Sequence, residues 1–223
     1  SDEAFSKFKS LAAGAMVGLG GIATYAVKQF AEYEQLVGGV ETLFKKNSGE
    51  VVQYAKNAYK TAQLSANQYM DTVTSFSASL LQGLKGDTAK ATKIADMAIT
   101  DMADNANKMG TSMESIQYAY QGFAKNNYTM LDNLKLGYGG TASEMARLIN
   151  DSGVMGKTFK ATAKNVSSIP FDKVIEAIHN IQTKLDITGT SAKEASSTIS
   201  GSFNAAKAAF DNMLTSLADP NGN

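Results

Sequence analysis

Apolar residues recur three and four positions apart along most of the chain, whereas strict alternation of apolar and polar residues is rare. The spacing is clearest in three stripes, which run from Tyr69 to Leu84, from Ala91 to Met109 and from Val174 to Leu185. Because an α-helix turns once every ~3.6 residues, side chains with this spacing lie on one face of a helix. The pattern predicts an all-α fold with about seven to nine helices joined by short loops.

Signals for helix starts and ends agree with these stripes. A hydroxyl residue precedes a glutamate or glutamine by three positions at Ser65, Thr111, Thr141 and Ser191. In such a pair the hydroxyl can accept a hydrogen bond from a free backbone N–H group while the longer side chain reaches back. Glycine ends helices at low cost, and the expected ends are Gly83, Gly86, Gly110, Gly137, Gly139, Gly140 and Gly189. The segment Ser168–Pro170 is expected to form a loop before the helix that ends near Leu185.

The N-terminal part carries one continuous apolar stripe from Leu11 to Phe44, with spacings close to an eleven-residue repeat. This repeat favours a nearly straight helix. We therefore expect three parts: an apolar, glycine-rich helix over residues 1–47, a compact multi-helix array over residues 48–219, and a short tail over residues 220–223.

The segment from Leu11 to Val27 carries no charge and places Gly14 and Gly18 four positions apart. Such a pair lets two helices approach closely, either against protein neighbours or in lipid. The segment is short for a membrane span and rich in Ala and Gly, which favours packing against protein; a secretory signal is a third interpretation. The candidate residues for helix packing or membrane contact are Gly14, Gly18, Leu19, Gly21 and Ile22.

Composition narrows the function classes. The 21 basic and 21 acidic residues cancel and form no block of like charge, so nothing favours binding to nucleic acid or an anionic membrane surface. The sequence has no cysteine and one histidine, which excludes disulfides, thiolate chemistry and any metal site built on a histidine pair of this chain. With two prolines, nearly the whole chain is free to be helical.

No candidate catalytic group emerges from the remaining motifs. Residues 153–158 contain a fragment of a phosphate-binding loop, but Asp151 occupies the position of its first glycine. Asp96, Asp101 and Asp104 are expected to lie on a solvated helix face, and His179 at the boundary of an apolar stripe. We therefore expect no enzyme activity, no cofactor and no metal ion.

The central passage, Tyr69 to Ile149, reads YMDTVTSFSASLLQGLKGDTAKATKIADMAITDMADNANKMGTSMESIQYAYQGFAKNNYTMLDNLKLGYGGTASEMARLI. It closely resembles phage tail tape measure proteins of tailed phages and prophages of Gram-positive hosts. The passages Tyr33–Lys45 and Ala177–Asp219 and the glycine-rich lead resemble the same family, so the similarity runs from about Ala4 to Asp219.

The resemblance implies a structural role in a longer protein of which this chain is a fragment. Proteins of this family lie in the lumen of the virion tail, determine tail length during assembly in the host cytoplasm and are released through the tip during genome ejection. The implied partners are the tail tube protein, tail assembly chaperones and distal tail or tip proteins. Self-association, contact with the host membrane and a membrane-active role in forming a conduit for DNA stay open. Some members cleave peptidoglycan through other domains, and this chain has no residues that match those sites.

Overall fold

The computed structural model describes residues 21–218, and within this range every regular element is a helix. The all-α class is therefore confirmed for the described residues, which form eight α-helices and three short 3-10 helices. In chain order the elements are α2 (Gly21–Phe44), η1 (Lys45–Asn47), α3 (Ser48–Thr61), α4 (Ala66–Gly83), α5 (Thr88–Met109), α6 (Met113–Ala124), η2 (Leu131–Leu134), α7 (Ala142–Ser152), η3 (Val166–Ser168), α8 (Phe171–Lys184) and α9 (Thr190–Ala218).

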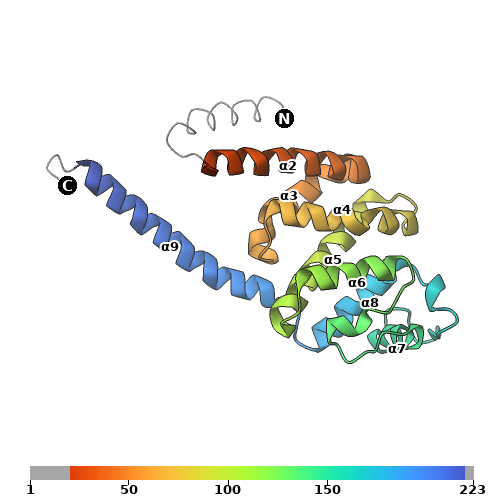
Figure 1. Ribbon diagram of the computed structural model, residues 1–223. Coiled ribbons are helices and arrows are strands. Elements are labelled where there is room, and N and C mark those ends of the chain that lie inside the picture. Colours follow the sequence, from red (N-terminus) through yellow and green to blue (C-terminus); the bar gives the residue numbers. More distant parts are fainter. Residues whose placement is uncertain (1–20, 219–223) are drawn as a thin grey trace.

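The helices stack in successive layers (Figure 1). Helix α2 lies on α3 and α4, α4 packs on α5, α5 packs on α8, and α8 packs on α7. Helix α9 contacts α3 and α5 and then projects away from the other helices. In the view of Figure 1 the first described turn of α2 and the last turn of α9 lie on the same side.

The three apolar stripes form the core. Tyr69, Val73, Phe76 and Leu80 on α4 are buried, and the rings of Phe76 and Phe171 meet edge to face with centroids 6.2 Å apart. Burial of the third stripe ends with its helix, since Leu185, just after α8, is 49% exposed to solvent. The spacing of three and four thus identified the buried faces, because burial follows the helical period.

Two of the expected helix starts are confirmed. Ser65 precedes α4, and its hydroxyl oxygen accepts a hydrogen bond from the backbone N–H of Gln68. The backbone N–H of Ser65 in turn donates to Oε1 of the Gln68 side chain. Thr141 accepts from the backbone N–H of Glu144 at the start of α7. The Glu144 carboxylate accepts instead from the N–H of Gly139, two residues before the cap.

The other two expected starts are wrong. Helix α6 is capped by Ser112 rather than Thr111, whose hydroxyl donates to the side chain of Asn105. Ser191 is buried, and its backbone N–H donates to a carboxylate of α5. At α6 the local cap is thus one residue later than expected, whereas at α9 the carboxylate of Asp104 on α5 replaces a local cap.

The glycine stops are borne out at several helix ends. Gly110 ends α5 with a φ of 69°, and Gly83 is the last residue of α4. The expected stop at Gly189 is wrong, because α8 ends at Lys184 and Gly189 lies just before α9. Gly140 is required for a different reason, because a Cβ atom there would clash with the backbone carbonyl group of Thr129. The expected limits at 47/48 and 219/220 remain predictions.

Candidate functional site

The apolar stripe of α2 is covered at one end of the helix and open at the other. Val40 and Phe44 near its C-terminal end are fully buried. Gly39 lies close to α4, where a Cβ atom would stand 3.7 Å from Cγ2 of Thr74. Toward the N-terminal end burial decreases: Ala26, Phe30 and Tyr33 of the stripe are partly buried, and Tyr25 beside the stripe is 64% exposed. The compact part therefore buries α2 completely only near its C-terminal end.

An open hollow of about 530 Å³ adjoins the exposed half of α2. Its wall on α2 includes the rings of Phe30 and Tyr33, whose centroids lie 6.0 Å apart. Ala66 and Asn67 at the start of α4 line the other wall, and the Asn67 amide donates to the carbonyl oxygen of Gln29 at 3.1 Å. An apolar hollow between two helices is a surface where another helix or chain can pack. We call this hollow between α2 and the start of α4 the α2 hollow.

The residues expected to mediate helix packing or membrane contact lie at or before this end of α2. Gly14, Gly18 and Leu19 lie outside the described residues. Gly21 is the first residue of α2, and a Cβ atom at this position would meet no described atom within 4 Å. Ile22 follows it in α2. The packing role assigned to these five residues stays a prediction. Within the described residues, no helix is both long and apolar enough to cross a bilayer.

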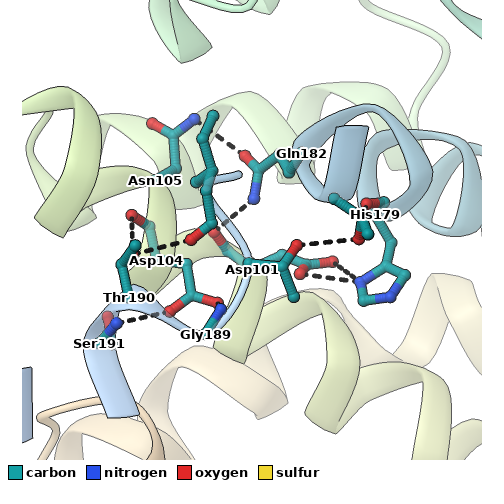
Figure 2. Close-up of polar contacts among 11 residues, drawn as sticks. Asp101, Asp104, Asn105, His179, Gln182, Gly189, Thr190 and Ser191 are labelled. Atoms are coloured by element: carbon teal, nitrogen blue, oxygen red, sulfur yellow. Dashed lines mark hydrogen bonds and ion pairs between the residues drawn. The ribbon is translucent and has the colours of Figure 1, made fainter. Parts of the chain in front are cut away.

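A second candidate site is a buried polar cluster between α5, α8 and the start of α9 (Figure 2). Asp101 on α5 is 1% exposed, and Nδ1 of His179 on α8 lies 3.0 Å from each of its carboxylate oxygens. Burial raises the pKa of Asp101 to about 6, although the hydrogen bond with His179 acts in the opposite direction. That hydrogen bond raises the pKa of His179. The pair links α5 to α8.

Amide side chains extend the cluster. Asn105 is fully buried and donates from its amide nitrogen to the carbonyl oxygen of Leu134 and to Oε1 of Gln182, each at 2.9 Å. Gln182 in turn donates to the backbone carbonyl oxygen of Asp101 at 3.0 Å. The Asn105 carbonyl oxygen accepts from Thr111 at 2.7 Å. The amides are hydrogen-bonded within the protein, as a stable buried polar network requires.

Asp104 uses its carboxylate to cap α9. It is fully buried, and its two oxygens accept from the backbone N–H groups of Gly189 at 2.8 Å and Ser191 at 2.9 Å (Figure 2). Thr190 donates from its hydroxyl to the backbone carbonyl oxygen of Asp104 at 3.3 Å. A carboxylate at a helix N-terminus satisfies free N–H groups and interacts favourably with the helix dipole. We call this arrangement the Asp104 cap.

The expectation of a solvated face for the three aspartates is therefore wrong at Asp101 and Asp104. Asp96 is half-buried and accepts from the hydroxyl of Tyr69 at 2.6 Å. The signal that could have found the buried pair is a second row on α5, where Ala98, Asp101 and Asn105 are spaced three and four apart. Polar residues that continue an apolar row indicate a buried network.

The cluster connects α5, α8 and the start of α9 through hydrogen bonds between buried groups. Its carboxylates are engaged by His179 and by backbone N–H groups, and no group of three or more His, Cys, Asp or Glu side chains converges among the described residues. Next to it, the Tyr120 hydroxyl is fully buried without a hydrogen-bond partner. Comparisons of the chain with protein-family models, with curated proteins and with solved structures gave no match.

Proposed function

We propose that this chain is a structural and assembly module of a phage tail tape measure protein, lying in the tail tube lumen and contributing to tail length determination until its release during genome ejection. One observation carries the proposal: a long helix lies at each end of the described chain. Helix α2 has 24 residues and α9 has 29. At ~1.5 Å per residue they span on the order of 36 and 44 Å. A protein that determines tail length needs such helices, because the end-to-end length of a helix is proportional to its number of residues.

The α2 hollow supplies the packing surface in this proposal. The glycine-rich helix expected over residues 1–47 contains α2, and the aromatic residues of the hollow give it a face for neighbouring protein. Apolar faces of long helices are stable only when they are covered. The tail tube protein, tail assembly chaperones, tip proteins and further copies of the chain are the proposed occupants.

Deletion of residues 48–219 in frame from the parent gene tests the proposal. Tail length in purified virions is measured by electron microscopy, and the protein is sought in those virions by mass spectrometry. We expect shorter tails of uniform length and the shortened protein inside them. Tails of unchanged length, or virions that lack the protein although it is expressed, would show that the module is no part of the tape.

The second candidate function is a membrane-active module that helps to form a conduit for DNA. The observation that favours it is the ring of Tyr25, which is 64% exposed on α2 and lies within the uncharged segment from Leu11 to Val27. Aromatic residues beside an apolar helix suit a membrane interface. Leakage of dye from liposomes by the intact chain, but not by a version that starts at Tyr33, would favour this function. Absence of leakage by the intact chain would contradict it.

A further inference from the structure

Three hollows adjoin one another around the first turns of α6. The central hollow, about 390 Å³, lies between α4 and α6. It shares Leu64 and Met113 with a hollow of about 260 Å³ that reaches the start of α9. It shares Glu114 and Tyr118 with a third hollow of about 210 Å³ that reaches η2. Neighbouring hollows thus share wall residues, and we call the three hollows together the α6 groove.

The α6 groove carries negative charge only. Asp71 on α4 and Glu114 on α6 both line its central part, and both are exposed. The lining of all three hollows contains no lysine, arginine or histidine. Neither carboxylate takes part in an ion pair among the described residues. On a chain whose charges balance overall, two carboxylates in one depression favour a cationic group.

Exposed apolar side chains lie beside these carboxylates. Tyr118 is 50% exposed, and its hydroxyl donates to Oε1 of Glu114 at 3.2 Å. Met130, which lines the third hollow with Glu114 and Tyr118, is 41% exposed. A lysine or arginine can lay its apolar stem on an aromatic ring while its charged end reaches a carboxylate, and exposed methionines adapt to varied apolar partners. This combination distinguishes the groove from an acidic surface alone.

The groove also offers hydrogen bonds to a peptide backbone. Gln68 and Gln117 line its centre, and Asn133 lines the end near η2. Thr72 donates to Oε1 of Gln117 at 3.3 Å, which orients that side chain. Side-chain amides provide both donors and acceptors, as an extended peptide segment requires.

We propose that the α6 groove binds a short segment of a partner protein in which a lysine or arginine stands next to an apolar residue. The charged group faces Asp71 and Glu114, and the apolar residue contacts Tyr118 and Met130. The segment lies across the first turns of α6. This inference rests on the groove alone and holds whether or not the chain acts in a phage tail.

Selection from a random heptapeptide library displayed on filamentous phage tests the inference. The library is first depleted on an immobilised variant with the substitutions Asp71→Lys and Glu114→Lys and is then selected on the unaltered chain. We expect enriched sequences that place lysine or arginine beside an aliphatic or aromatic residue. Failure to enrich any sequence, or enrichment of neutral or acidic sequences, would overturn the proposal.

The most enriched peptide is then synthesised, and its affinity is measured by titration calorimetry. The neutral double variant Asp71→Asn/Glu114→Gln should bind it about tenfold more weakly. The matched control, Glu32→Gln/Glu41→Gln, removes two exposed charges on α2 outside the groove and should bind as the unaltered chain does. Tyr118→Ser, a change at an exposed position, should also weaken binding. Equal affinity for all four proteins would overturn the proposal, and equal melting temperatures establish that the variants are folded.

Discussion

Asp101 and Asp104 lie about one turn apart on α5, and their burial serves different purposes. Asp101 faces a side chain that can itself gain or lose a proton, His179. Asp104 faces backbone N–H groups, which cannot titrate. Substitution of Asp101 and substitution of Asp104 therefore test two different interactions. The two residues allow electrostatic and capping contributions to be measured separately.

Replacing Asp104 with alanine should destabilise the protein by on the order of 3 kcal/mol. The change leaves the N–H groups of Gly189 and Ser191 without their acceptor in a buried place. Urea unfolding followed by circular dichroism measures the loss, and amide exchange should rise at these two N–H groups. Glu194→Gln removes an exposed carboxylate in the first turns of α9 and should change stability little. Equal stability of the two variants would contradict the Asp104 cap.

Stability should fall as the pH rises from about 4 to about 8. The folded pKa values of Asp101, about 6, and of His179 both lie above their ordinary values. The folded chain therefore holds more protons than the unfolded chain in this range, and each deprotonation removes stability. For Asp101 we expect a loss on the order of 2 kcal/mol. Urea titrations at about pH 4.5 and about pH 8 measure it, and Asp101→Asn should flatten the difference. An equal slope in both proteins would contradict the assignment.

Tyr120→Phe should leave stability unchanged or raise it by about 1 kcal/mol. The substitution removes a buried hydroxyl that has no hydrogen-bond partner and keeps the ring that packs against Phe123. Thermal unfolding measures the effect. Tyr69→Phe is the matched comparison, since its hydroxyl donates to Asp96, and its loss should destabilise the protein. A marked loss of stability in Tyr120→Phe would reveal a partner for that hydroxyl.

At the scale of elements, α2 behaves as two halves. The half that ends in Phe44 is part of the core, while the half around Tyr25 borders the α2 hollow. One apolar stripe runs through both halves, so the sequence pattern alone does not reveal at which residue neighbouring helices cease to bury the side chains of α2. What covers a helix is decided by the neighbours that tertiary packing brings to it.

Paired substitutions on α2 test this division. Phe44→Ala should cost about 3–5 kcal/mol, because the ring is fully buried and a cavity replaces it. Tyr25→Ala should cost less than about 0.5 kcal/mol, because its ring is mostly exposed. Chemical denaturation of both variants gives the comparison. Similar losses would mean that the two halves are equally covered.

The same contrast explains what could be predicted from the sequence. Ser65 caps α4 through a residue three positions on, so the signal is local and the prediction is confirmed. Ser191 fails because its N–H donates to Asp104, 87 residues earlier in the chain. Asp101 and His179 are 78 residues apart, and nothing near either residue indicates the other. Periodicity reveals faces and local caps, while buried polar pairs depend on the packing of distant helices.

At the scale of the whole molecule, the compact part and α9 are distinct. Ser191 and Ala195 are buried at the start of α9, and beyond them every α9 side chain whose exposure is described is exposed. Helix α9 therefore depends on its first turns for attachment to α3 and α5. The described side chains beyond Ala195 add length to the molecule and do not add to the core.

Ending the chain after Thr198 should keep the melting temperature within about 2 °C, because the removed side chains whose exposure is described are all exposed. The maximum dimension from small-angle scattering should fall by on the order of 30 Å, in proportion to the residues removed. Ending the chain after Leu185 also removes the Asp104 cap and should lower the melting temperature. A large loss of stability on the first truncation would show that α9 folds back on the compact part.

The first described turn of α2 and the far end of α9 lie on the same side in Figure 1, and this arrangement has a mechanical consequence. A force that draws α2 and α9 apart acts on their contacts one after another, from the exposed ends inward, rather than on all contacts at once. Along α2 the residues around Tyr25 separate first, and Phe44 separates last. Along α9 the load reaches the body at the Asp104 cap. Contacts that break one after another yield to a smaller force than contacts that must break together. Tension on the chain ends can therefore separate the helices of this module one by one, until they lie end to end in an extended chain.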